Sequence, residues 1–217
     1  MGLALKEHII FGTCAGRAVF LDYEENRYFC LSPALNDAFL SLQTRQISED
    51  NELVGALQAA GVIRVVAGQD DLSPASIPAA TSTLSEDPIG MTLASFSAIT
   101  ALECLRARCH LKHRPLRSFL DPSKAGLLYE RDRFVAQDLI SLVRHFQAQG
   151  RILSNRDRCL AHSIALRWRL EREGHGAALV FGVRLFPFQA HCWLQRGVTV
   201  LNDHHEHVAQ YTPVLAA

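Results

Sequence analysis

The sequence predicts an α+β protein built from two modules. Short strands followed by helices open the chain, and helices followed by an antiparallel set of strands close it. Residues 68–88 lie between them, rich in Ser, Ala, Pro and Asp and without hydrophobic periodicity. With 217 residues, 48% of them hydrophobic, the chain is long enough to bury a core in each module. We therefore expect domains at 1–68 and 89–217, joined by a linker at 69–88.

Three β-rich segments begin the first module, at residues 8–12, 17–23 and 27–31. Ser32 and Pro33 then form a helix start, with Ser as the N-cap and Pro at the first helical position. A second helix begins at Ser48 and ends at Gly61, before a last strand at 62–66. This order of elements predicts a winged-helix-like module with a three-stranded sheet.

Helices begin the second module. The pattern predicts them at 89–109, at 133–149 and around Cys159, the last ending at Gly174 and Gly176, with a basic, proline-containing loop at 110–126. Three strands follow, AALVFGVRL (177–185), QAHCWLQ (189–195) and VTVLND (198–203).

Charge and hydropathy exclude several classes of protein. The net charge is zero, and residues 1–68 carry five Lys and Arg against eight Asp and Glu, so we expect no nucleic-acid partner. No apolar run approaches the ~20 residues of a membrane span, so we expect no membrane partner. Glu7 and His8 stand where a signal peptide would be apolar, which favours a cytoplasmic location. The six cysteines are then reduced thiols.

Cys159 is the candidate nucleophile. Asn155 or Asp157 would cap the helix that follows, so the thiol would lie in a first turn, where the helix dipole favours a thiolate. Most lone cysteines are inert core residues, but His191 lies on a later strand and Asp203 ends the next one. These three residue types can form a Cys-His-Asp triad, in which the imidazole moves the proton and the carboxylate fixes its tautomer.

The pieces RCLAHSIALRWRLEREG, LVFGVRLFPFQAHCWLQ and GVTVLND resemble the lasso peptide B proteins, leader peptidases of the papain- and transglutaminase-like fold. The resemblance implies a cysteine protease that binds a ribosomal precursor peptide by its leader and cleaves leader from core. It assigns Cys159, His191 and Asp203 as catalytic and calls for no cofactor. It also implies an ATP-dependent, asparagine synthetase-like lactam synthetase as partner. The Cys159 N–H is one oxyanion donor, whereas Leu153 and Ser154 occupy the region of the papain-like glutamine, so the second donor is unassigned.

The first module is similar to the precursor-peptide recognition element of peptide-modifying systems. In that family the leader adds a strand to the sheet edge beside a helix. This places the leader at Arg27, Tyr28, Phe29, Cys30 and Leu31, with Leu53 and Leu57 facing it. The family's middle helix would have to fit within residues 45–51.

Other interpretations remain open. The same triad could transfer an acyl group to an amine, as transglutaminases do. Alternatively, the protein could be a non-enzymatic winged-helix binding protein, with a DNA-binding first module and a ligand-binding second one. His205 and His207 would share a face if the last strand continued, but two ligands make a poor zinc site, so no metal is expected. Strand alternation points Cys192 away from His191, into the core.

Overall fold

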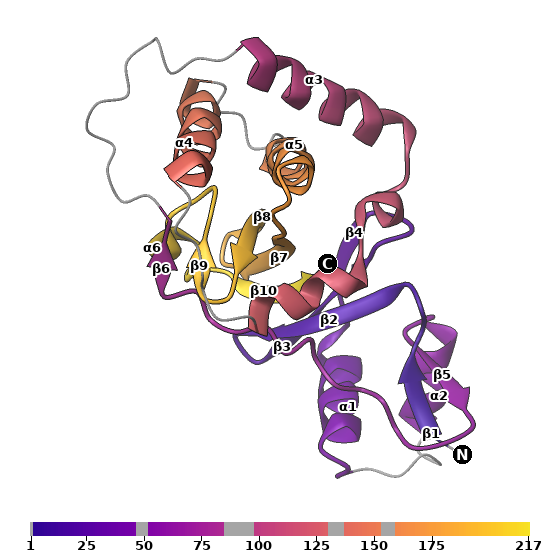
Figure 1. The fold of residues 1–217 in the computed structure, drawn as a ribbon. Helices are drawn as coiled ribbons and strands as arrows, with labels where there is room; N and C mark the ends of the chain where they lie inside the picture. The colour runs from indigo at the N-terminus through magenta and orange to yellow at the C-terminus, as the bar shows by residue number, and fades with distance from the viewer. Residues whose placement is uncertain (1, 47–51, 85–97, 130–136, 153–158) are drawn as a thin grey trace. The chain divides into compact units, whose positions relative to one another are not determined.

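The computed structural model describes residues 2–46, 52–84, 98–129, 137–152 and 159–217. They form two compact units, Met1–Ser76 and Ile77–Ala217, each with mixed helix and strand (Figure 1). None of the helices in these ranges is both long enough and apolar enough to cross a bilayer.

An antiparallel three-stranded sheet organises the first unit, in the order β2-β3-β4. The strands are β2 (Ile9–Cys14), β3 (Arg17–Asp22) and β4 (Arg27–Cys30), which confirms the three predicted strands. Ala15 and Gly16 connect the first two, with φ values of 49° and 75°. Positive φ at both positions is what a two-residue hairpin of matching twist requires.

Helix α1 (Pro33–Gln43) covers this sheet, as predicted from Ser32 and Pro33. Ser32 stands at the N-cap position, although its hydroxyl makes no capping hydrogen bond. Phe39 of α1 packs edge-on against Phe11 and Phe20, with ring centroids 4.9 and 5.0 Å apart. These three aromatic rings form the centre of the first unit's core.

Helix α2 (Glu52–Ala59) ends just before Gly61, and β5 (Ile63–Val66) follows. Strand β1 (Gly2–Leu5) was not predicted, and it pairs antiparallel with β5. β1 contains no β-branched residue, and its partner lies some sixty positions away, so local pattern could not reveal it. The middle helix expected within 45–51 falls largely outside the described residues, and the winged-helix likeness stays a prediction.

Residues assigned to the linker make specific contacts. Asp70 Oδ1 accepts a hydrogen bond of 2.7 Å from the Leu3 N–H, and Leu72 is buried in the first unit's core. Ile77 and Ala80 pack against the core of the second unit. The described part of this stretch is therefore folded onto both units, although its composition resembles that of a flexible linker.

A five-stranded sheet in the order β10-β7-β8-β9-β6 organises the second unit. Its strands are β6 (Ser82–Thr83), β7 (Ala178–Leu185), β8 (Phe188–Arg196), β9 (Thr199–Val200) and β10 (Thr212–Ala216). The last predicted strand is shorter than expected, because β9 ends at Val200 and a helical turn, α6 (His205–Val208), follows. His205 and His207 therefore lie on a helix and not on one face of a strand.

Three helices, α3 (Ala98–His113), α4 (Gln137–Ile152) and α5 (Cys159–Arg172), lie together over this sheet (Figure 1). The predicted basic loop at 110–126 is largely helical. α3 continues to His113, and the 3₁₀ helices η2 (Leu116–Phe119) and η3 (Pro122–Tyr129) follow. Proline fits the first positions of such helices because its missing N–H would have no partner there.

Helix α5 is the centre of the second unit. It packs against α3, α4, β7 and β8, and Ser163, Ile164, Ala165 and Leu166 are fully buried. A helix surrounded in this way holds its side chains in fixed positions, including Cys159 at the start of its described length.

Candidate active site

His191 and Asp203 are in direct contact. The Nε2–H of His191, on β8, donates a hydrogen bond of 2.5 Å to Oδ2 of Asp203. The exposed fraction is 16% for the His191 side chain and 17% for the Asp203 side chain, so the pair is largely buried but reachable from solvent. With Nε2 engaged, Nδ1 is the imidazole nitrogen left to exchange a proton with another group.

Strand parity in the sequence predicts that Asp203 can face His191 only if the hairpin around Arg196 and Gly197 has an odd loop, or if a bulge lies near Asn202. The structure shows a different route. Arg196 pairs with Thr199 and Gln195 with Val200, so the loop is the two residues Gly197 and Val198. Gly197 has a φ of 53°, which glycine accepts without strain. In a continued strand this register would turn Asp203 to the face opposite His191.

Asn202 prevents that outcome by ending the strand. Its Oδ1 accepts a hydrogen bond of 2.8 Å from the Leu194 N–H, in place of a main-chain carbonyl. Its Nδ2 donates to Ser163 Oγ on α5, also at 2.8 Å. The chain bends at residues 201–203, and the bend brings the Asp203 carboxylate to the imidazole. The sequence pointed to Asn202 only as the place of a compensating bulge, and the role of its side chain was missed.

Asp203 has a second histidine partner. His207 Nδ1, on α6, donates to the same Oδ2 at 2.9 Å, and the His204 N–H donates to Oδ1 at 2.7 Å. Burial raises the pKa of Asp203, but the hydrogen bonds from His191, His207 and the His204 backbone outweigh it and lower the pKa. The carboxylate therefore stays ionised beside the imidazole.

Cys159 makes hydrogen bonds with both Cys192 and His191. The Cys192 thiol and backbone N–H donate to the Cys159 sulfur. Cys192 is buried, as predicted, yet it reaches the site as a donor, a role that sequence reasoning missed. The only sequence signal for it is its place next to His191.

These contacts make Cys159 acidic. The hydrogen bond from Cys192 lowers its pKa most, burial opposes this, and His191 lowers it further, to about 4. Burial works against a charged His191, but the hydrogen bonds to Asp203 and Cys159 raise its pKa to about 9. A proton shared in this way gives a thiolate and an imidazolium at neutral pH.

His162 is a second histidine near the thiol, but its environment suits a structural role. Its Nε2 bonds the backbone carbonyl of Phe146 at 2.7 Å, and burial lowers its pKa. A neutral imidazole held by its own backbone contact is poorly placed to accept a proton from Cys159.

Three possible metal ligands, His191, Asp203 and His207, have donor atoms within 4.8 Å of one another. The two hydrogen bonds to Asp203 account for this spacing, and a metal would have to displace both N–H protons. His205, the other histidine considered from the sequence, bonds Thr83 Oγ1 at 3.0 Å instead. The geometry therefore favours a proton-transfer site over a metal site.

The residues assigned to leader binding lie in three different environments. β4 is an end strand of its sheet, and it carries Arg27, Tyr28, Phe29 and the exposed Cys30. Leu31 and Leu57 lie in the core, at 7% and 0% exposure, so a bound peptide would not touch them without rearrangement. Leu53 is exposed at 38%, on a helix that packs against α1 and β5.

Several sequence predictions fall outside the described residues. These are the helix caps Asn155 and Asp157 and the upstream positions Leu153 and Ser154. The second oxyanion donor therefore remains unassigned.

The second unit matches a known family. A family model described as the transglutaminase-like superfamily matches residues 101–216, more than half of the chain, and Cys159, His191 and Asp203 lie within this range. No curated protein and no solved structure matches the chain.

Proposed function

The chain belongs to the transglutaminase-like superfamily, and from this we propose that it is a cysteine peptidase that removes the leader from a lasso precursor peptide. The observation that carries the proposal is the position of His191 between Asp203, to which it is hydrogen-bonded, and Cys159. This arrangement lowers the pKa of Cys159 to about 4 and raises the pKa of His191 to about 9, which favours a thiolate beside an imidazolium. This is the resting state that a thiol nucleophile requires.

The reaction has two steps, acylation and deacylation. In acylation the Cys159 sulfur bonds to the carbonyl carbon that ends the leader, and the C–N bond to the core breaks. His191 gives its proton to the leaving amine, which becomes the N-terminus of the core. In deacylation His191 takes a proton from water as the hydroxide attacks the thioester. The leader leaves as a carboxylic acid, and the thiolate and imidazolium are restored.

Asp203 supports both steps through His191. Its bond to Nε2 fixes the ring orientation and stabilises the imidazolium each time it forms. The developing oxyanion needs donors of its own, and the Cys159 N–H is the first of them. In other proteases the loss of one such donor costs roughly 10²–10³ in rate.

The first unit would supply recognition. β4 is an end strand of its sheet among the described residues, so an extended leader could add to its outer side through main-chain hydrogen bonds. The proposed partners are the precursor peptide and an ATP-dependent, asparagine synthetase-like lactam synthetase, which would use the newly freed amine. The proposed location is the cytoplasm.

Incubation with a lasso precursor peptide, taken from a short reading frame next to the gene, tests the activity. Mass spectrometry should show leader and core as separate products. Cys159→Ala should abolish cleavage, whereas Cys109→Ala, which changes an exposed thiol on α3, should not. Cleavage by the Cys159→Ala protein would refute the proposal.

The same experiment separates hydrolysis from acyl transfer. In ¹⁸O-labelled water, hydrolysis places the label in the new leader carboxylate. With an added primary amine, a transferase would instead give a leader amide without the label. Amide as the main product would assign the chain to acyl transfer.

Leader recognition has its own test. A proline moved stepwise through the leader removes one N–H at a time, and it should weaken binding wherever that N–H meets β4. Equal affinity for every proline position would exclude strand addition.

A further inference from the structure

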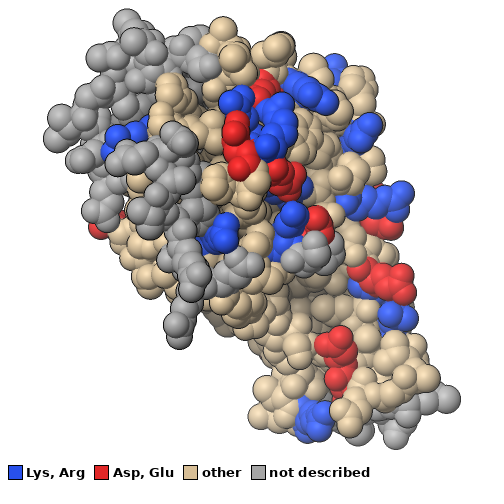
Figure 2. Space-filling model, in the orientation of Figure 1, with Lys and Arg blue, Asp and Glu red and all other residues tan. Residues whose placement is uncertain are grey.

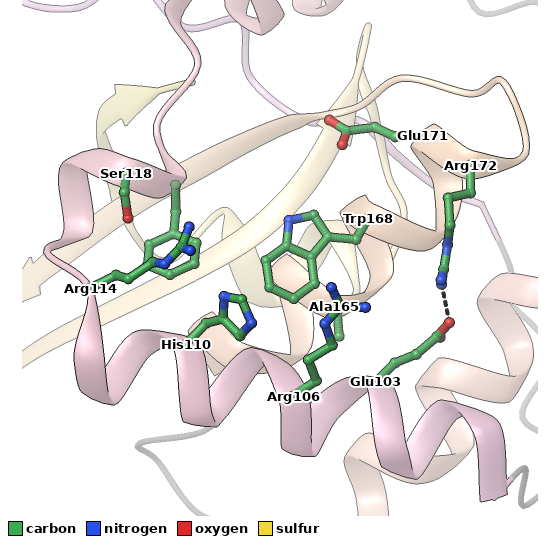
Figure 3. Close-up of a pocket in the computed structure, with 10 residues that line it drawn as sticks. Glu103, Arg106, His110, Arg114, Ser118, Ala165, Trp168, Glu171 and Arg172 are labelled. Carbon is green, nitrogen blue, oxygen red and sulfur yellow. Dashed lines mark hydrogen bonds and ion pairs between the residues drawn. The ribbon is translucent and has the colours of Figure 1, made fainter.

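A pocket of about 480 Å³ lies between α3 and α5, closed on one side by η2 (Figure 3). It belongs to the second unit but contains none of Cys159, His191 and Asp203. Its floor is Trp168, nine residues beyond Cys159, which is about 14 Å along α5 at 1.5 Å per residue. The pocket is therefore separate from the thiol, within reach of one extended peptide.

Three nitrogen-bearing side chains line the α3 wall in a row. Arg106 and His110 are four residues apart on α3, and Arg114 comes directly after the helix ends at His113. The Arg114 N–H still donates to the His110 carbonyl at 2.9 Å, so helical spacing continues to Arg114 and the three residues follow one side of the helix. Eight residues of helix span about 12 Å. Figure 3 shows Arg106 and His110 rising from α3 toward Trp168, and Arg114 at the end of the helix, on the side of Ser118.

The positive charge of this row is not neutralised by the carboxylates nearby. Glu103 is paired with Arg169 and Arg172, and Glu171 with Lys124 and Arg167. Within the described ranges Arg106 and Arg114 have no ion-pair partner, although basic and acidic side chains are interspersed on the face in Figure 2. Two guanidinium groups are thus available to an anionic ligand.

The floor is aromatic and partly exposed. The guanidinium of Arg106 lies 5.8 Å from the Trp168 ring centroid, and the His110 ring meets it edge-on at 5.4 Å. Phe119 lies 6.3 Å away on the η2 side. An apolar side chain could pack on this surface between the two arginines.

We propose that this pocket binds an acidic, extended peptide segment of the substrate, with two carboxylates four residues apart and an apolar residue between them. An extended chain rises about 3.3 Å per residue, so four residues cover about 13 Å, close to the Arg106–Arg114 spacing. Charge complementarity selects the acidic peptide over a neutral one. The proposal rests on the peptidase function above, and it assigns a second contact on the peptide away from the cleaved bond.

Fluorescence titration of the full-length Cys159→Ala protein tests it, with acetyl-Glu-Ala-Phe-Ala-Glu-amide as the probe. Trp168 lines the pocket and Trp193 is buried elsewhere, so the signal should report on the pocket. The matched Gln-Ala-Phe-Ala-Gln peptide should bind about tenfold more weakly, since exposed ion pairs contribute up to ~1 kcal/mol each. Added salt should reduce the difference.

Variants locate the contact. Arg106→Gln with Arg114→Gln should remove the preference for the acidic peptide. Arg108→Gln, an exposed arginine of α3 outside the pocket lining, should leave it unchanged. Equal affinity for the two peptides, an equal loss in Arg108→Gln, or displacement of the peptide by an equal concentration of inorganic phosphate would overturn the proposal.

The titration measures binding to a protein that cannot turn the peptide over. Its result therefore tests the pocket independently of the peptidase function. In the active enzyme the double arginine variant should raise KM for an acidic peptide substrate and leave kcat unchanged. A fall in kcat with unchanged KM would contradict a binding role.

Discussion

Cys159 owes its acidity to hydrogen-bond donors as well as to the nearby charge of His191. Cys192 is the largest contributor, because its buried thiol keeps its own proton and donates it to the sulfur of Cys159. Burial and the neighbouring thiolate both raise the pKa of Cys192, so the negative charge stays on Cys159. Two adjacent thiols thus have opposite roles.

Cys192→Ala should therefore raise the pKa of Cys159. A hydrogen bond to a charged group contributes about 1.5–3 kcal/mol, so the increase should be at least about one pH unit. Titration of the thiolate by ultraviolet absorbance measures it. Cys192→Ser keeps a donor and should restore most of the effect, while Cys104→Ala, which removes a buried thiol of α3, should have none. An unchanged Cys159 pKa in Cys192→Ala would contradict this role.

Activity should follow a broad bell-shaped pH profile. Below pH about 4 the thiolate of Cys159 is protonated, and above pH about 9 the imidazolium of His191 loses its proton. Asp203→Asn removes the carboxylate that holds the His191 pKa up, so the alkaline limb should move to lower pH. By analogy with serine proteases, kcat should fall by roughly 10²–10⁴. Glu206→Gln, an exposed carboxylate nearby, should change neither, and an unmoved alkaline limb in Asp203→Asn would exclude the proposed role.

The grouping of Cys159, His191 and Asp203 could be predicted because residue type and chain order indicate it, and the structure brings the three together. Their catalytic role stays a prediction. The role of Cys192 could not, since strand alternation says only that its side chain points away from His191. Whether that direction leads to inert core or to the thiol depends on where α5 packs, which is a tertiary contact.

At the scale of elements, the bend after β9 decides whether the site forms. Strand parity correctly indicates that a regular two-residue hairpin would separate Asp203 from His191, but the expected remedy, an odd loop or a bulge, is wrong. The hairpin is even, and the Asn202 side chain ends the ladder instead. When a side-chain oxygen replaces a main-chain carbonyl as the acceptor of a ladder hydrogen bond, no sequence pattern indicates it clearly.

Asn202→Ala should loosen this bend. The variant loses the bond from the Leu194 N–H and the bond to Ser163, so unfolding free energy should fall by about 1–3 kcal/mol in urea titrations. Asp203 would hold His191 less firmly, so the alkaline limb of the pH profile should shift down as well. Ser163→Ala removes only one of the two bonds and should do less. Wild-type stability and pH profile in Asn202→Ala would show that Asn202 does not position Asp203.

At the scale of the whole molecule, composition predicted two modules and a linker between them, and the compact units divide at Ser76 and Ile77. The exact domain bounds remain a prediction. Composition could not reveal that Asp70 and Leu72 belong to the first unit. The stretch around them is too short to show hydrophobic periodicity, and the two residues contact β1 and core residues that are far away in the sequence.

A fragment of residues 1–76 should therefore be more stable than one of residues 1–68. The shorter fragment lacks the buried Leu72, whose side chain contributes about 1.5–3 kcal/mol, and the Asp70 bond to Leu3. Urea denaturation followed by circular dichroism compares them. Leu72→Ala in the longer fragment should lose part of the difference, and equal stability of the two fragments would place the boundary before Asp70.

The central claim is that Cys159 is a thiolate at neutral pH and the nucleophile of the chain, and its alkylation rate tests this without a substrate. Limiting iodoacetamide is applied across the pH range, and peptide mapping follows all six cysteines. We predict that Cys159 is labelled first and that its rate is nearly constant from about pH 5 to 8, between its own pKa of about 4 and that of His191 at about 9. A Cys159 rate that climbs toward the pKa of an ordinary thiol, or faster labelling of Cys109 or Cys30, would contradict the account.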